Sequence, residues 1–304
     1  MKALRIFFIV ACIFAFNSGY SQTVIEKNAK EKNIKLPPKP WHMMVLRWHF
    51  TEPVNDFKQF DIDVTIDRDI PESYNLYISP INAQINKATF YGGLQTNVNG
   101  WVSAKEQRRV HRGKGSIFSR WSIGEKNPIG LEYVDMREGG LCESAGYEGE
   151  FCSVRYPFKW TAGKYTLSLI KEETITLKNA PHTWVKMVVT DKNGTKTQIG
   201  RLLFEGDTLA FMPYNAAFVE IYSTEKTPNS DVPEAIITFG YPKINGVKQP
   251  ATKVAAQHTP SGIAGSPNCA DVFSEGDNIS VYISPNVRPQ TTNPITYDIS
   301  LANN

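Results

Sequence analysis

Short runs of β-branched and aromatic residues, separated by turn residues, constrain the fold of this chain more strongly than any other feature of its sequence. From Trp41 onward such runs alternate with Gly, Pro, Asn and Asp about every 8 to 15 residues. Residues 60–66 (FDIDVTI) alternate strictly between apolar and polar side chains, as a half-buried strand does. No segment has the pattern of three capped helical turns, and 19 Pro and 21 Gly are spread along the chain. We therefore predict an all-β fold.

Many strands without helices are typical of sandwiches and barrels, and we predict an antiparallel two-sheet β-sandwich of 12 or more strands. The Asn193-Gly194 pair between two apolar runs predicts a β-hairpin. We expect one domain over residues 41–304 with a long loop at 246–276, because the stretch after that loop is too short to fold alone. The predicted strands are 43–50, 60–66, 76–81, 88–96, 116–122, 129–136, 151–156, 164–171, 184–190, 196–204, 219–223, 235–239, 279–283 and 296–301.

The first 22 residues have the layout of a secretory signal peptide. Lys2 and Arg5 precede an unbroken apolar run over residues 6–16, and small polar residues follow it. That run is shorter than the roughly 20 apolar residues a spanning helix needs. Residues 23–40 are Lys-rich and end in prolines, which predicts an extended polar leader. We expect a secreted or periplasmic protein without a membrane span.

Composition and charge exclude several classes of protein. The hydrophobic fraction is 41% and the charged fraction 21%, which are ordinary values for a globular chain and exclude a mainly disordered one. The formal net charge is +3, and loss of Lys2 and Arg5 with the signal peptide would leave +1. So small a net positive charge does not indicate general nucleic-acid binding. We expect no nucleic-acid partner.

Three cysteines follow the predicted signal peptide. Cys142 and Cys152 flank a loop rich in turn residues, and export to an oxidising compartment permits disulfides. We predict a Cys142–Cys152 disulfide across a hairpin; the alternative is two reduced cysteines packed near each other. Cys269 has no predicted disulfide partner, and we expect it to be either a buried cysteine or a free thiol. We expect no metal and no cofactor, because the histidines are scattered and none neighbours the pair; they are His42, His49, His111, His182 and His258.

The segment that begins at Tyr91 holds the best candidates for ligand binding. On a strand, Tyr91, Gln95 and Asn97 would share one face, and Trp101 follows shortly after. Aromatic rings stack on sugar rings and amides give paired hydrogen bonds to hydroxyls, so this combination suits a carbohydrate. The alternative is a buried polar strand whose amides are satisfied internally.

A strongly basic segment follows over residues 105–114. It has two interpretations: a solvated loop between strands, or a cationic rim that attracts an acidic ligand such as a uronate or sulfated polysaccharide. Its basic residues and its histidine are Lys105, Arg108, Arg109, His111, Arg112 and Lys114.

The strand predicted at 116–122 places Phe118, Arg120 and Ser122 on one face. Arg120 would then need a carboxylate partner or a ligand, because an unpaired buried charge is costly. We expect Trp121 and Trp160 to lie in the core, as tryptophans in strand patterns usually do.

The sequence contains no Gly-x-Ser-x-Gly motif, no His-Glu-x-x-His motif and no Gly-rich phosphate-binding loop. Glu132, Asp135 and Glu138 could suggest paired catalytic carboxylates, but on a strand successive members of this set point to opposite faces.

Several ordered motifs are shared with a known family. They are Phe90-Tyr91-Gly92-Gly93-Leu94-Gln95, IFSRW at 117–121, Cys142…Gly149-Glu150…Cys152, YPFKWTAGKY at 156–165, Trp184 and Phe218-Val219-Glu220. Through them residues 76–246 resemble a family of secreted, mostly bacterial domains of unknown function. The resemblance implies an antiparallel β-sandwich of the lectin-like (concanavalin-like) jelly-roll kind, with relatives often found beside carbohydrate-binding modules. It implies no catalytic residue.

Three functions remain open on the sequence. The first is a secreted protein that binds extracellular, acidic polysaccharide through Tyr91, Gln95, Asn97, Trp101 and Arg120, with Arg108, Arg109, His111 and Arg112 at the rim. The second is a polysaccharide lyase or glycoside hydrolase on the same face, in which His111 or Tyr91 moves a proton. The third is a structural or adhesive envelope protein without a small ligand.

Overall fold

The computed structural model describes residues 40–123, 129–147, 149–222, 232–258, 269–287 and 295–297. The predicted signal peptide, and the predicted leader up to residue 39, lie outside the described residues. Within the described ranges there is no α-helix, only two 3-10 turns, η1 (Glu72–Tyr74) and η2 (Leu131–Tyr133). In this described part, no helix has the length and apolar character needed to cross a membrane.

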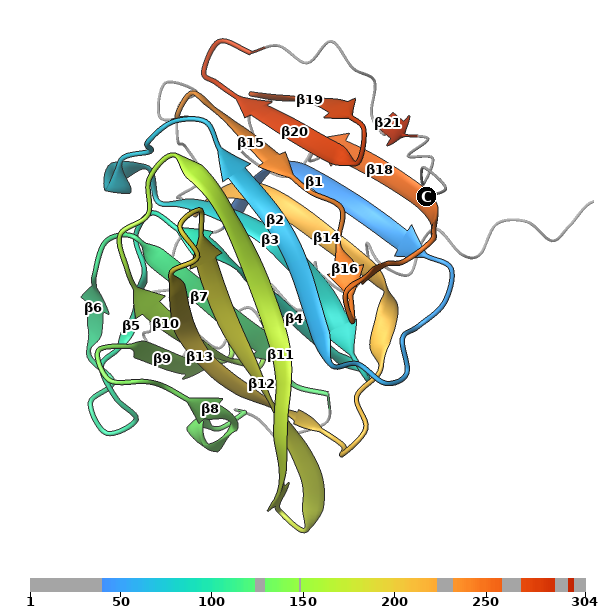
Figure 1. The fold of residues 1–304 in the computed structure, drawn as a ribbon. Helices are drawn as coiled ribbons and strands as arrows, with labels where there is room; N and C mark the ends of the chain where they lie inside the picture. The colour runs from blue at the N-terminus through green and yellow to red at the C-terminus, as the bar shows by residue number, and fades with distance from the viewer. Residues whose placement is uncertain are drawn as a thin grey trace, which may run out of the picture.

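The strands form two antiparallel sheets that pack in layers, which confirms the predicted two-sheet β-sandwich (Figure 1). Sheet A has eleven strands in the order β21-β18-β1-β14-β3-β4-β7-β10-β9-β5-β6. Its strands are β1 (Pro40–Phe50), β3 (Leu76–Ile85), β4 (Ala88–Gln95), β5 (Asn99–Trp101), β6 (Arg109–His111), β7 (Gly115–Trp121), β9 (Leu141–Ala145), β10 (Phe151–Pro157), β14 (Phe211–Tyr222), β18 (Ala251–His258) and β21 (Ile295–Tyr297).

Sheet B has ten strands. Eight follow the order β19-β20-β15-β2-β11-β12-β13-β8, and β16 and β17 join beside β2. Its strands are β2 (Gln59–Ile66), β8 (Val134–Asp135), β11 (Gly163–Leu177), β12 (Ala180–Asp191), β13 (Lys196–Glu205), β15 (Ala235–Phe239), β16 (Lys243–Ile244), β17 (Val247–Lys248), β19 (Ala270–Glu275) and β20 (Asn278–Ile283).

Phenylalanine side chains from both sheets form the centre of the core. The Phe90 ring of β4 lies 5.5 Å from the Phe204 ring of β13 and 6.1 Å from the Phe118 ring of β7. Phe211 stacks on Phe60 of β2 at 5.2 Å. Because successive side chains of a strand point to opposite faces, an inward Phe90 places Tyr91 on the outer side of sheet A.

Local sequence explains the hairpin between β12 and β13. Gly194 has φ +82°, and the Asp191 carboxylate accepts the backbone N–H groups of Asn193 and Thr195 at 2.9 and 2.8 Å. The predicted Asn-Gly hairpin is therefore confirmed. The strands β11 and β12 run longer than predicted. Between them, Lys178 and Asn179 adopt φ of 50° and 63° and form a second tight turn, so the two strands extend up to that turn.

Two predictions of secondary structure were wrong. Residues 246–276 are not one long loop, because they include β17, β18 and β19; residues 259–268 lie outside the described part. β18 is rich in Ala, a weak strand former, yet it pairs along β1 and buries Val254 and Ala256. Residues 129–136 form η2 and the two-residue β8, not a full strand.

The predicted disulfide is not formed in the described structure, where no bond joins Cys142 to Cys152. The β9–β10 register places Val154 opposite Cys142 and Ser144 opposite Cys152. The two cysteines are therefore diagonal neighbours, about 7–8 Å apart in such a ladder, which is beyond the usual reach of a disulfide.

The Phe211 ring should be a major source of stability, because it contacts the buried rings of Phe57, Phe60 and Phe90. We predict that Phe211→Ala lowers the free energy of unfolding by about 3–5 kcal/mol, measured by chemical denaturation. The matched control is Phe273→Ala, whose ring is 48% exposed and should change stability by no more than about 0.5 kcal/mol. Equal losses in the two variants would contradict this view of the core.

Candidate binding face on the outer side of sheet A

Polar and aromatic side chains gather on the side of sheet A that faces away from sheet B, which we call the outer face. The strand registers define it: Tyr91 lies opposite Ser119, Ser119 opposite Ser153, and Ser153 opposite Glu143. In-register partners share a side, so all four point outward with Tyr91. Four adjacent strands, β4, β7, β10 and β9, thus contribute to one surface.

A second lateral row of this face runs through Gln95. Gln95 lies opposite Tyr77 of β3 on one side and Gly115 of β7 on the other, and Tyr77 lies opposite Glu220 of β14. His42 of β1 lies opposite Glu220. The row therefore brings a histidine, a carboxylate, a phenol and an amide together from four adjacent strands.

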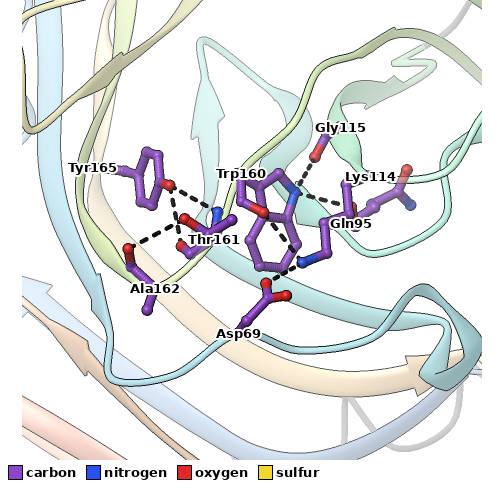
Figure 2. A network of polar contacts seen from close by, with 8 residues as sticks. All are labelled: Asp69, Gln95, Lys114, Gly115, Trp160, Thr161, Ala162 and Tyr165. Atoms are coloured by element: carbon purple, nitrogen blue, oxygen red, sulfur yellow. Dashed lines mark hydrogen bonds and ion pairs between the residues drawn. The ribbon is translucent and has the colours of Figure 1, made fainter.

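Trp160 fixes the backbone on which Gln95 sits (Figure 2). Its indole Nε1 donates to the carbonyl oxygens of Gln95 and Gly115, both at 3.1 Å. Lys114 lies over the indole, with Nζ 4.6 Å from the ring centroid, and donates to the Trp160 carbonyl and to Asp69. Trp160 is fully buried, as predicted. In Figure 2 the Gln95 amide points away from this network.

The Gln95 side chain is the least satisfied polar group of the outer face. It is fully buried, yet neither its Nε2 nor its Oε1 has a hydrogen-bond partner within the described residues. Burying an amide without partners costs about 1–3 kcal/mol. The amide of Asn215 on β14, also buried, gives a contrast: it donates to the Pro80 carbonyl at 3.0 Å and accepts from the Asn82 N–H at 3.2 Å. Gln95 is therefore a buried amide whose hydrogen-bonding capacity the described residues leave unused.

A buried ion pair lies on the same face, on strands β9 and β10. Arg155 Nη2 lies 3.0 Å from Glu143 Oε2, and both side chains are almost completely buried. Arg109 of β6 also pairs with Glu143, and the Tyr147 hydroxyl donates to Glu143 Oε1 at 2.8 Å. Arg155 Nη1 donates to Ser153 Oγ at 2.9 Å, while its Nε has no hydrogen-bond partner within the described part of the chain. Two guanidinium groups thus share one carboxylate, which leaves this cluster cationic.

Electrostatics of the cluster follow from these contacts. Burial alone would raise the pKa of Glu143, but the guanidinium groups of Arg155 and Arg109 outweigh it and hold that pKa below its ordinary value. Burial opposes the charge of Arg155, yet Glu143, followed by the hydroxyls of Tyr147, Tyr91 and Tyr77, holds the pKa of Arg155 above its usual range. Both groups are therefore charged at neutral pH.

A line of aromatic rings crosses the same face. The His42 ring lies 5.0 Å from the Phe218 ring, Phe218 lies 6.0 Å from Tyr91, and Tyr91 lies 5.4 Å from Trp121. Phe218 is buried, whereas His42, Tyr91 and Trp121 are half-buried. Trp121 was expected in the core and instead contributes to this outer line.

His42 and Glu220 form a pair at one end of the aromatic line. His42 Nε2 lies 3.0 Å from Glu220 Oε2; the imidazole is 36% exposed and the carboxylate 6%. A buried carboxylate at one ring nitrogen fixes the orientation of the imidazole.

Arg120 does not belong to the outer face, contrary to the sequence prediction. It points between the sheets, where its guanidinium lies 5.3 Å from the Phe204 ring and 5.2 Å from the Tyr133 ring. Its Nη1 donates to the Leu203 carbonyl of the facing sheet. Arg120 does share an inward face with Phe118, as predicted, so the strand alternation was right and only the side assigned to binding was wrong.

Asn97 and Trp101 also lie off the predicted recognition face. β4 ends at Gln95, so Asn97 follows the strand and does not continue its outer row. Trp101 lies opposite Cys142, which in turn lies opposite the core residue Val154. Trp101 is therefore on the side that continues the inner face at the end of sheet A. Of the predicted sugar-binding set, Tyr91 and Gln95 share the outer face.

The basic segment divides into two groups. Arg109 reaches the outer face through its pair with Glu143. Arg108, whose Nε lies 2.9 Å from Glu106 Oε1, is exposed, and so are His111 on the edge strand β6 and Arg112. These three residues are exposed, whereas Arg109 contacts Glu143 and Lys114 contacts Trp160.

The three acidic residues that could suggest catalytic carboxylates in the sequence do not belong to the outer face. Asp135 lies 2.6 Å from Arg201 Nε, Glu132 lies 2.7 Å from Lys178 Nζ, and Glu138 is exposed. Within the described ranges, no three His, Cys, Asp or Glu side chains are grouped so that they could hold a metal ion.

Sequence reasoning missed most of the charged and aromatic residues that the face contains. They are His42, Tyr77, Glu143, Arg155, Phe218 and Glu220. A local signal existed for two of them, since Arg155 and Glu220 are charged residues inside otherwise apolar strands. Their partners lie on strands distant in the sequence, which no local pattern indicates.

Comparison with known proteins does not assign a function to this chain. The chain matches no family model, and no curated protein matches its sequence.

The Glu143–Arg155 pair should make stability depend on acid. Because the folded-state pKa of Glu143 lies below its ordinary value of 4.5, the pair adds stability above pH 4.5 and loses it as the pH falls through the folded pKa. We predict that Glu143→Gln costs about 3–5 kcal/mol at pH 7, since Arg155 would stay buried and unpaired. The loss should shrink as the pH falls below about 4.5.

Denaturation midpoints between pH 3 and pH 7 would measure this effect. The control is Glu106→Gln, because the exposed Glu106–Arg108 pair should be worth less than about 1 kcal/mol. Equal losses for the Glu143 variant at both ends of the pH range would contradict the assigned charge state.

Proposed function

We propose that this protein is exported and binds acidic polysaccharide through the outer face of sheet A. The observation that carries the proposal is the Gln95 amide, which is buried on this face without a hydrogen-bond partner in the described structure. A sugar hydroxyl or carboxylate supplies the donors and acceptors that such an amide lacks.

Elsewhere on the same face, aromatic side chains fit a sugar. Tyr91 and Trp121 are half-buried rings with centroids 5.4 Å apart, and such rings stack on the apolar faces of pyranoses. The combination of a few fixed polar groups with aromatic surface is the usual composition of a small-molecule site.

The charge of the face favours an acidic sugar over a neutral one. Arg155 and Arg109 share one buried carboxylate, Glu143, so this cluster of three side chains carries one net positive charge, whereas the other buried carboxylate of the face, Glu220, pairs with His42. The exposed cations Arg108 and Arg112 lie in the same basic segment as Arg109, and they would steer a polyanion toward the face. The signal-like pattern over residues 1–22 supports an extracellular or periplasmic location for such a ligand.

Replacement of Gln95 by leucine separates binding from folding. We predict that Gln95→Leu raises the free energy of unfolding by about 1–3 kcal/mol, because the side chain keeps its volume and loses an unpartnered amide. The same change should weaken binding to polygalacturonate, alginate or hyaluronan by about tenfold or more, measured by calorimetry at low ionic strength.

The matched control is Gln257→Leu. Gln257 lies on β18 and accepts a hydrogen bond from Arg47 at 2.8 Å, so its loss should lower stability by about 1 kcal/mol and leave binding unchanged. Undiminished binding by the Gln95 variant would contradict the proposal. Failure of the unmodified chain to bind any of the three polyanions would also contradict it. The second of these results would favour a structural or adhesive role.

A further inference from the structure

A second group of basic side chains lies on sheet A, at the end formed by β18, β1 and β14. His49 of β1 lies opposite Lys253 of β18 on one side and Tyr214 of β14 on the other, so the three share one lateral row. The rings of His49 and Tyr214 lie 5.3 Å apart. Arg47 precedes His49 by two residues on β1 and points to the same side. We call these four residues the Arg47 site.

The strand registers place the Arg47 site on the outer face. Arg47 lies opposite Ala216 of β14, which lies opposite Asn82 of β3. Asn82 in turn lies opposite Tyr91 of β4. In-register partners share a side, so Arg47 points outward with Tyr91. Because β1 and β4 are three strand spacings apart, the backbones of these two residues lie about 14–15 Å from each other. A polymer that crosses the strands along this row therefore passes both.

The positive charge of the Arg47 site is not balanced within the described residues, where no carboxylate forms an ion pair with its basic side chains. Arg47 Nη1 donates to the neutral Gln257 Oε1 at 2.8 Å, which orients the guanidinium without cancelling its charge. Arg201 of sheet B gives a contrast, since it is also half-buried and its Nε lies 2.6 Å from Asp135. Arg47 and Lys253 thus leave two positive charges on this part of the outer face.

The pKa values show that the groups of the site act on one another. Burial, followed by the charges of Lys253 and Arg47, lowers the pKa of His49, so the imidazole is neutral at pH 7 and offers an N–H donor. Burial raises the pKa of Tyr214, and the charge of Arg47 opposes that rise without reversing it. The phenol therefore keeps its proton at pH 7 and is a second neutral donor.

The donors of the site fit a tetrahedral oxyanion better than a carboxylate. A guanidinium, an ammonium, an imidazole and a phenol come from three neighbouring strands, so they can approach one anion from several directions. A sulfate or phosphate ester has three terminal oxygens to accept their hydrogen bonds, whereas a carboxylate has two oxygens in one plane. Arginine is also well suited to such groups, because its planar donors bind two oxygens at once.

We propose that the Arg47 site binds a sulfate or phosphate ester of the acidic polysaccharide, and the identity of the polymer that carries the ester rests on the proposed function. Arg47 and Lys253 hold the negative charge of the ester, and His49 and Tyr214 donate hydrogen bonds to its oxygens. Uronate polymers without such esters bind without this site, because Gln95 on β4 makes their contacts.

Calorimetry with chondroitin 4-sulfate and with unsulfated chondroitin of equal length tests the proposal, because the two polymers share a backbone that contains uronate and differ in the ester. At constant ionic strength, we expect the unmodified chain to bind the sulfated polymer about tenfold more tightly. Arg47→Gln should remove most of this difference and leave the affinity for unsulfated chondroitin unchanged.

The matched control is Lys192→Gln. Lys192 is an exposed cation in the hairpin between β12 and β13 of sheet B, so its loss removes the same charge away from the outer face and should keep the difference. An equal effect of the two substitutions would show a general charge effect and overturn the proposal.

Magnetic resonance of the imidazoles, with glucose 6-sulfate and glucose 6-phosphate as probes, tests the site without a polymer. We expect the signals of His49 to shift with at least one probe, and those of His182, which is buried beside Tyr133, to stay fixed. A shift with one probe alone supports the site and identifies the ester that it takes.

The outcomes separate this proposal from the proposed function. A preference for the sulfated polymer that survives Arg47→Gln would overturn the site, and so would His49 signals that neither ester moves. Equal binding of the two chondroitins by the unmodified chain would overturn the ester proposal alone. Binding of neither chondroitin, with His49 signals that still shift, would remove the proposed function and support the ester site.

Discussion

The ion pair between Glu143 and Arg155 is the interaction on which the outer face of sheet A depends. It joins neighbouring strands β9 and β10, and both charges are almost completely removed from water. Loss of either partner would leave the other charge buried and unpaired, at a high cost in free energy. The pair therefore fixes both side chains in place. Arg109 extends the pair to β6, and Tyr147 extends it to the end of β9. The result is a positive charge held in a defined position among phenolic side chains.

The buried amide of Gln95 differs from two other buried polar side chains of the molecule. The buried Trp160 Nε1 serves two carbonyl oxygens, and the buried Asn215 amide both donates and accepts. Gln95 lies on the same sheet, on a backbone held by Trp160, and its amide points away from that network (Figure 2). Among the described residues, Gln95 is the buried side chain in which two polar atoms lack a hydrogen-bond partner, and the proposed ligand binding rests on this observation.

The all-β class and most strands were predictable because period-two alternation is a local property. The segment around β2 shows it, and so does the turn at Gly194, where a positive φ selects glycine. β18 could not be predicted, because its alanines gain strand character only by packing along β1. The placement of Arg120 shows a second limit: alternation shows which residues share a face, but only the partner sheet decides which face is inside. The His42–Glu220 pair joins the first and fourteenth strands, and no local pattern reports such a contact.

The most direct test of the account is a nuclear magnetic resonance titration of the side-chain amides with an oligogalacturonate. If the outer face binds the sugar through its unpartnered amide, the signals of the Gln95 Nε2 protons should shift as the site saturates. The corresponding signals of Gln257, whose side-chain oxygen accepts a hydrogen bond from Arg47, should stay fixed. Saturable binding that leaves the Gln95 signals unmoved would place the ligand elsewhere and contradict the central claim.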